Sequence, residues 1–186
     1  LYLFMDIYSR KIVGWQIYTK QSSELASELI KDIAINENIQ ADTVTLHSDN
    51  GSPMKGATFL TTLQKLGIMP TFSRPSVSDD NPYSESLFKT LKYTPSYPSK
   101  PFESITESRK WCETFVTWYN NEHCHSSIGF VTPIQRHLLQ DEEILKKRHL
   151  VYEKAKEANS LRWSGTTRNW HFIKEVHLNP NKVKVN

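Results

Sequence analysis

Two acidic residues stand at positions where a side chain can do chemistry. Asp49 follows a short apolar run within the turn-prone sequence His47–Gly51, and Glu85 comes shortly after Asn81 and Pro82, a pair typical of a helix start. Carboxylates held by such elements can bind the divalent metal ions that catalyse phosphoryl transfer. Each residue alone has a simpler interpretation, because an aspartate often shapes a turn and a glutamate often stabilises a helix N-terminus.

The helix expected over residues 82–92 places three charged side chains on one face. Glu85, Lys89 and Lys92 are spaced i, i+4 and i+7. Its apolar side chains are expected to point the other way, into a core: Leu87, Phe88 and Leu91. A solvated Glu–Lys pair is the simpler interpretation of the charged face.

The elements that must position these residues alternate between strand and helix. Strands are expected over Leu1–Met5, Ile12–Tyr18, Thr43–His47 and Met69–Phe72, the first two as a β-hairpin. Helices are expected over residues 23–36, 57–66, 82–92, 105–121 and 134–158. Ser73–Asp80 has no apolar periodicity and is expected to be a loop. The alternation predicts an α/β domain.

Composition bounds the class of protein. With 186 residues, 38% hydrophobic and 23% charged, the chain is expected to be soluble and globular, without a membrane span. Cys112 and Cys124 are too few for a disulfide framework and fit a reducing cytoplasm. From Ile144 to Asn186 ten Lys/Arg face three Asp/Glu, whereas residues 1–143 hold thirteen against seventeen. Such a chain suits phosphate binding by one part and metal binding by another, although a solvated basic tail fits equally well.

The spacing of the two carboxylates then becomes informative. Thirty-five residues separate Asp49 from Glu85. In this spacing and in its local motifs the chain resembles the insertion-sequence transposases of the retroviral-integrase-like DDE group, which carry a D-D-35-E signature. The matching motifs are Asp6–Trp15, His47–Gly51, Asp80–Lys92, Trp118–Asn121, His125-Ser126 and Thr132-Pro133.

The resemblance implies a fold, a site and partners. It implies an RNase H-like mixed sheet flanked by helices over residues 1–137, followed by a basic helical or irregular extension over 138–186. Asp49 and Glu85 would be catalytic and would hold Mg²⁺ or Mn²⁺, while Lys89 and Lys92 would contact DNA. The expected partners are transposon ends, target DNA and further copies of the chain, in a bacterial cytoplasm close to the nucleoid. No glycine-rich phosphate loop is present, so no nucleotide cofactor is expected.

The family's first catalytic aspartate has no counterpart in this chain. In the relatives it lies on a strand that precedes the hairpin, whereas Asp6 matches a different aspartate that is expected to tie the hairpin turn to Ser9 or Arg10. The chain is therefore expected to be an N-terminally truncated piece without the central strand of the sheet, and to be weakly folded on its own.

Other motifs and readings stay open. His123, Cys124 and His125 lack the ligand spacing of a zinc site, so zinc is not expected. The basic and aromatic residues of the tail fit either DNA contacts or a small β-rich subdomain: Arg162, Trp163, Arg168, Trp170 and His171. Two alternatives to a transposase core are a non-catalytic DNA-binding or assembly fragment and an RNase H-like nuclease without strand transfer.

We predict that this polypeptide alone neither cleaves nor joins DNA in Mg²⁺ or Mn²⁺, because a carboxylate of the metal site is missing. A gel assay that follows cleavage and joining of labelled DNA ends measures this. Robust activity would show that Asp6 serves as the third metal ligand.

Overall fold

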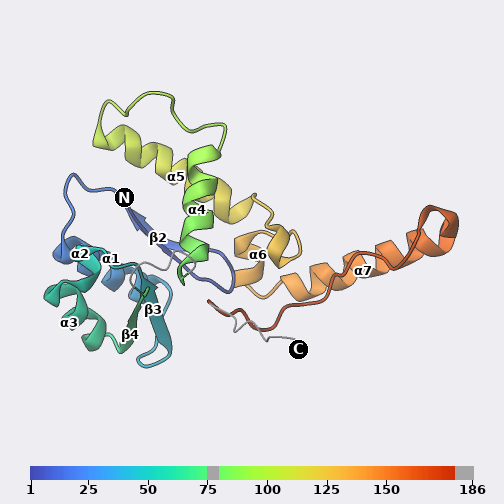
Figure 1. The fold of residues 1–186 in the computed structure, drawn as a ribbon, viewed down its shortest axis with the longest axis horizontal. Coiled ribbons are helices and arrows are strands. Elements are labelled where there is room, and N and C mark those ends of the chain that lie inside the picture. Colours follow the sequence, from blue (N-terminus) through green and yellow to red (C-terminus); the bar gives the residue numbers. More distant parts are fainter. Residues whose placement is uncertain (75–79, 179–186) are drawn as a thin grey trace. The chain divides into compact units, whose positions relative to one another are not determined.

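The computed structural model describes residues 1–74 and 80–178, which form two compact units (Figure 1). The first unit contains Leu1–Met5, Ile12–Phe115 and the described residues from His177 onward; the second contains Asp6–Lys11 and Val116–Val176. Most of the predicted loop Ser73–Asp80, and the basic residues beyond 178, lie outside the described part of the chain. The domain boundary predicted at residue 137 concerns the family's catalytic core and stays a prediction.

The element order is that of an alternating α/β chain. The first unit holds β1 (Tyr2–Met5), β2 (Ile12–Gln16), α1 (Ser23–Asn36), β3 (Val44–Ser48), α2 (Ser52–Lys55), α3 (Ala57–Lys65), β4 (Ile68–Phe72) and α4 (Pro82–Tyr93). Helix α5 (Ile105–Asn121) begins in the first unit and ends in the second. The second unit holds η2 (Ser126–Ile128), α6 (Pro133–His137), α7 (Asp141–Ala158) and η3 (Ser160–Arg162). The strands and the helices up to α5 lie where they were predicted, and the short α2 is an addition.

The strands pair two by two. β1 and β2 form the predicted antiparallel hairpin, with Tyr2 opposite Gln16, and β3 and β4 pair in parallel, with Val44 opposite Ile68. Within the part of the chain that the structure describes, these pairs are two separate sheets. The parallel pair matters for the site, because its two carboxyl ends lie at the same edge.

Helix α1 covers the core of the first unit. The Ser22 hydroxyl caps the helix by accepting a hydrogen bond from Leu25 N at 3.2 Å, as predicted. Helix α3 ends at Lys65 and is followed two residues later by Gly67, whose φ of +66° favours glycine. The buried core contains Tyr2, Phe4, Ala26, Leu29, Ile30, Ile33, Phe59, Leu63 and Ile68. These residues come from α1, α3 and the two strands β1 and β4, so apolar burial joins these four elements.

The single helix predicted over residues 134–158 is wrong. The structure has two helices, α6 and α7, separated by a turn in which Leu139 has a φ of +57°. Periodicity gave no sign of the break because the apolar spacing continues across it. The two sides of the break are joined by a buried pair: the side chains of Arg136 and Asp141 are both fully buried and form an ion pair with Nη1–Oδ2 of 2.9 Å. A continuous helix would place these residues five positions apart, on neighbouring turns but not face to face.

Arg136 also joins the other segments of the second unit. Its Nε donates to the Tyr8 carbonyl at 2.8 Å, and its Nη2 donates to the Ile173 carbonyl at 2.7 Å. The guanidinium lies over the Tyr8 ring, 4.2 Å from its centroid. One buried side chain therefore connects the turn after β1, the start of α7 and the segment that follows α7.

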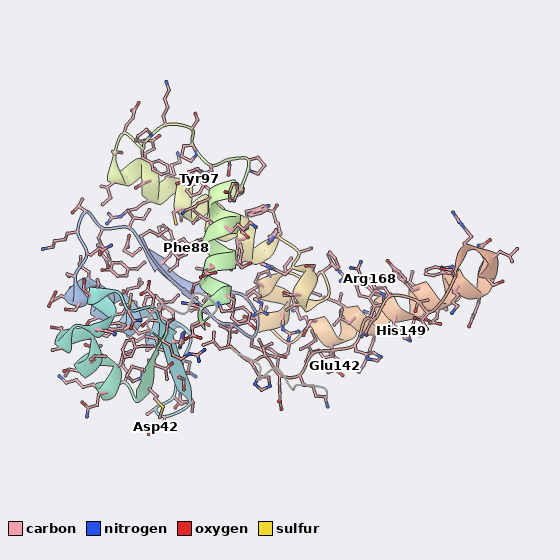
Figure 2. All side chains as sticks on the ribbon, viewed as in Figure 1. Asp42, Phe88, Tyr97, Glu142, His149 and Arg168 are labelled. Carbon is pink, nitrogen blue, oxygen red and sulfur yellow. The ribbon has the colours of Figure 1, made fainter. Side chains whose placement is uncertain are left out.

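The segment after α7 returns along that helix (Figures 1 and 2). Trp170 is 8% exposed and packs edge-on against Tyr152 of α7 with ring centroids 5.2 Å apart. Arg168 lies over the Phe130 ring at 4.3 Å. No strand occurs over residues 159–178, so the β-rich subdomain considered for the tail is wrong for its described part.

Asp6 has the structural role predicted for it. Its Oδ1 accepts from Tyr8 N at 3.0 Å, and its Oδ2 accepts from Ser9 N at 3.2 Å and Ser9 Oγ at 2.5 Å. Both carboxylate oxygens thus hold the turn of the hairpin.

Among the described helices, none combines the length and the apolarity that crossing a membrane requires.

Replacing Asp141 by Asn, or Arg136 by Met, should lower the free energy of unfolding by about 3–5 kcal/mol, because either change leaves a buried group without its charged partner. Urea denaturation followed by circular dichroism measures the loss. Glu142→Gln is the matched control, since it breaks an exposed i,i+4 pair with Lys146 on the same helix and should leave the urea midpoint unchanged. Equal midpoints for Asp141→Asn and Glu142→Gln would contradict a central role for the buried pair.

Candidate active site

Asp49 lies directly after β3, at the carboxyl end of the parallel pair. The end of β3 is fixed to the end of β4, because the His47 ring lies within hydrogen-bonding distance of Thr71 Oγ1 (3.0 Å) and Ser73 Oγ (3.2 Å). Asp49 Oδ1 accepts from Gly51 N at 3.0 Å, which forms the predicted turn. The side chain is exposed, so its second oxygen can meet a ligand from solvent.

Glu85 lies in the first turn of α4. The Asn81 side chain caps this helix by accepting from Ser84 N at 3.4 Å, and Pro82 occupies its first turn, as predicted. Leu87 and Leu91 are buried, 3% and 6% exposed, and they fix the rotation of the helix. Glu85 therefore projects from a capped helix on its exposed side.

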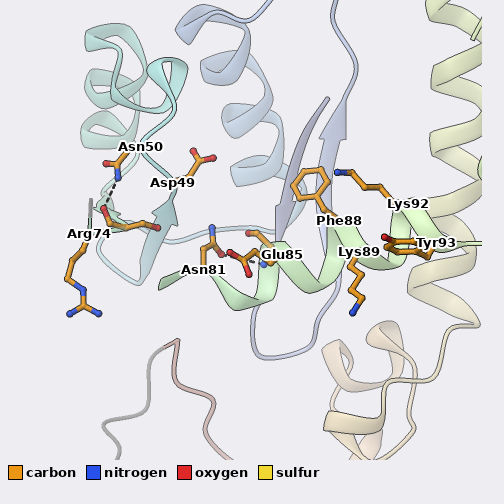
Figure 3. Close-up of a pocket in the computed structure, with 11 residues that line it drawn as sticks. Asp49, Asn50, Arg74, Asn81, Glu85, Phe88, Lys89, Lys92 and Tyr93 are labelled. Atoms are coloured by element: carbon orange, nitrogen blue, oxygen red, sulfur yellow. Dashed lines mark hydrogen bonds between the residues drawn. The ribbon is translucent and has the colours of Figure 1, made fainter. Parts of the chain in front are cut away.

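All four predicted site residues line one pocket of about 950 Å³ in the first unit (Figure 3). Asp49 lines it from the end of β3, and Glu85, Lys89 and Lys92 line it from successive turns of α4. The remaining lining residues are Asn50, Ser73, Arg74, Asn81, Ser84, Phe88 and Tyr93. The pocket thus combines carboxylates, which suit a cation, with lysines, which suit phosphate.

The prediction that Phe88 points into a core is wrong. Phe88 is 37% exposed and lines the pocket beside Glu85 and Lys89 (Figures 2 and 3). The reason is angular: a residue three positions after Glu85 lies only about 60° from it around the helix axis. Leu87 and Leu91 occupy the opposite side, as predicted. The pocket therefore offers one aromatic face among its polar groups.

Sequence reasoning missed an ion pair at the pocket's edge. Arg74, after β4, donates from Nε and Nη2 to the Asp80 carboxylate at 2.9 and 2.7 Å. These hydrogen bonds raise the pKa of Arg74, so its charge is secure. Both residues lie in the stretch assigned to a featureless loop. The opposite charges of Arg74 and Asp80, near the two ends of that loop, are the sequence signal that could have predicted the ion pair.

The donor set fits a divalent metal only in part. Asp49 and Glu85 supply the carboxylate oxygens that Mg²⁺ and Mn²⁺ prefer. Over residues 1–74 and 80–178, however, no group of three or more Asp, Glu, His or Cys side chains is arranged to hold a metal ion. The pair would thus be part of a metal site rather than a complete one.

The His123–His125 segment belongs to the packing of the second unit. His125 packs against the Tyr119 ring with centroids 4.9 Å apart, and burial lowers the pKa of His125 to about 4. His123 stacks on Tyr119 at 5.6 Å, and burial also lowers the pKa of His123. Both imidazoles are neutral at pH 7 and pack as aromatic rings.

Comparison with known proteins bears on the family and the fold of the chain. Two family models, both described as integrase core domain, match residues 1–78 and 66–133. The chain is 30% identical over 132 residues to the transposase for insertion sequence element IS904 of Lactococcus lactis subsp. lactis (strain IL1403). The match covers 69% of this chain and 51% of that protein, so the chain spans about half the length of this relative.

A second relative carries a different name. An ATP-dependent protease of Lactococcus lactis subsp. lactis is 31% identical over 102 residues, which cover 54% of this chain and 33% of that protein. Because only a third of the protein is matched, the activity in its name is not carried over to this chain.

Among solved structures, the catalytic core domain of BIV integrase matches with a TM-score of 0.50 and 19% identity, over 68% of this chain and 77% of that chain. This likeness confirms the predicted α/β, RNase H-like fold. The family models, the IS904 relative and the shared fold agree with one another. The two integrase core domain models together span residues 1–133, and these findings support an insertion-sequence transposase of the integrase-like DDE group.

Proposed function

We propose that this chain carries part of the catalytic core of a DDE transposase, which cleaves DNA at the ends of a mobile element and joins the freed 3′-hydroxyl to target DNA. One observation supports the proposal most: Asp49 and Glu85, separated by thirty-five residues in sequence, line the same pocket. Lys89 and Lys92 line it as well, so groups for a cation and for a phosphate backbone lie together.

The residues divide the work by charge. Asp49 and Glu85 would hold Mg²⁺ or Mn²⁺, and a bound ion would supply charge stabilisation at the scissile phosphate. Lys89 and Lys92 would bind neighbouring phosphates and orient the DNA strand. Phe88, which lines the same pocket, offers a ring on which an unpaired base can stack.

The partners follow from the same chemistry. Transposon ends and target DNA are the proposed substrates, and further copies of the chain are the proposed assembly partners. The proposed location is the bacterial cytoplasm, at the nucleoid, where that DNA lies.

A non-catalytic DNA-binding or assembly fragment is the second candidate. The observation in its favour is that Asp49 and Glu85 are not joined by a third metal-binding side chain within the described residues. Such a fragment would retain the lysine-bearing face of α4 and would bind DNA without cleaving it.

Asp49→Asn and Glu85→Gln should each weaken Mn²⁺ binding to this chain roughly tenfold or more, because a hard cation loses an anionic ligand. Titration followed by electron paramagnetic resonance of free Mn²⁺ measures the affinity. Glu113→Gln, on the exposed side of α5, is the matched control and should bind Mn²⁺ like the parent chain. Equal affinities for all four proteins would refute the metal-binding role of the pair.

Asp49→Asn also distinguishes the candidate functions in any form of the protein that cleaves and joins DNA. Asp49→Asn should abolish cleavage and joining there and leave DNA binding intact. Supplying pre-cleaved ends then distinguishes a transposase core, which joins them, from a simple RNase H-like nuclease, which does not.

Lys89→Gln and Lys92→Gln should each reduce the salt dependence of DNA binding, because each lost phosphate contact lowers the slope of log K against log[salt] by about 0.9 for duplex DNA. Fluorescence anisotropy with a labelled duplex at several salt concentrations gives the slope. Lys65→Gln is a matched control, since Lys65 is exposed in the last turn of α3 and does not line the pocket. A slope that falls equally in all three variants would mean that charge alone, and not the α4 face, governs binding.

A further inference from the structure

The two candidate carboxylates lie on different elements of the fold. The distance between Asp49 and Glu85 therefore depends on how the end of β3 is held relative to α4. Asp49 follows β3, and Glu85 is carried by α4, which begins at Pro82. On the Asp49 side, Asn50 Nδ2 donates to the Ser73 carbonyl at 2.9 Å, shown as a dashed line in Figure 3. Ser73 N in turn donates to the Ser48 carbonyl at 3.0 Å. The turn that carries Asp49 is thereby tied to the residue just before Arg74.

Arg74 continues this connection toward α4. Its side chain binds the Asp80 carboxylate through two hydrogen bonds, and its backbone N donates to Asp80 Oδ2 at 2.7 Å. Asp80 therefore receives three hydrogen bonds from one residue. Its side chain is 5% exposed, whereas that of Arg74 is 71% exposed. A two-pronged guanidinium–carboxylate contact fixes orientation as well as distance.

Asp80 is followed at once by Asn81, the N-cap residue of α4. Asn81 caps the helix through its side chain, and the Asn81 carbonyl accepts from Glu85 N at 3.2 Å. Holding Asp80 therefore holds the first turn of α4, where Glu85 lies. The hydrogen-bonded path thus runs from the turn after β3, through Ser73, Arg74 and Asp80, to the start of α4.

We propose that the Arg74–Asp80 pair is a clamp that positions Glu85 relative to Asp49, with both clamp residues acting through the backbone rather than on the substrate. The inference rests on the proposed function for its chemical meaning, because the separation of two carboxylates matters when both hold one metal site. The positional claim itself concerns only the arrangement of β3 and α4.

The clamp is suited to positioning more than to stability. An ion pair with one exposed partner contributes little to the free energy of folding, because water screens the charge and the long side chain loses entropy. The buried carboxylate and the forked geometry still restrict where the backbone can lie. Breaking the clamp should therefore loosen the site while most of the fold is kept.

Spin labels on the two elements test the positional claim directly. Ser52→Cys on α2, just after the Asp49 turn, and Ser86→Cys on α4 are exposed sites that leave both carboxylates in place. Cys124, which is exposed, is replaced by Ser in this background. Cys112 can remain, because it is fully buried and burial raises the pKa of its thiol to about 12, so it will not take up the label. Double electron–electron resonance then gives the distribution of distances between the labels.

Asp80→Ala should broaden this distribution most, because it removes all three hydrogen bonds, and Arg74→Gln should broaden it less, since the backbone hydrogen bond to Asp80 remains. Arg74→Lys should resemble Arg74→Gln, because lysine keeps the charge but not the fork. Glu142→Gln, which breaks an exposed ion pair in the second unit, should leave the distribution unchanged. Far-ultraviolet circular dichroism identifies any variant that fails to fold, and Arg74→Lys then carries the test. Distributions in the folded clamp variants as narrow as in the parent would overturn the proposal.

Mn²⁺ binding to the same proteins connects the clamp with the site. If Asp49 and Glu85 hold the ion, Asp80→Ala should weaken Mn²⁺ binding roughly 10- to 100-fold, as loss of an outer support typically does. A broadened distribution without any Mn²⁺ binding by the parent chain would uphold the clamp and refute the metal site. An unchanged distribution together with normal Mn²⁺ binding would refute the clamp and uphold the metal site.

Discussion

A charged side chain that is taken out of water must find an opposite charge and enough hydrogen bonds, and both compact units depend on this constraint. In the second unit it acts on Arg136 and Asp141, which are fully buried and bind each other. In the first it acts on Asp80, which is nearly buried and takes its hydrogen bonds from Arg74. The Arg136–Asp141 pair joins α6 to the start of α7, and the Arg74–Asp80 pair joins the end of β4 to the start of α4.

The local features of the fold could be predicted because local chemistry causes them. Ser22 and Asn81 cap helices through their own side chains, and Gly67 allows a positive φ at the end of α3. Asp6 satisfies a turn two and three residues away. In each case the cause lies within a few residues of its effect, and the sequence shows both.

The features that were missed depend on contacts and geometry that apolar periodicity does not show. At the break between α6 and α7, Arg136 pairs with Asp141, and Arg136 also binds carbonyls of residues far along the chain. Likewise, Arg74 lies in a stretch without apolar periodicity, and it binds a side chain six positions away. Phe88 was assigned to the core by its residue type, although helix geometry places it on the face of Glu85.

The contact between Arg136 and the Ile173 carbonyl also bears on how the chain acquires its structure during synthesis. A ribosome releases the polypeptide from its N-terminus onward, so Tyr8 and Arg136 emerge well before residue 173. Until that carbonyl is available, the guanidinium lacks one of its acceptors and stays hydrated. The second unit can therefore close only after residue 173 has been synthesised, whereas β3, β4 and the helices α1 and α3 lie within residues 23–72.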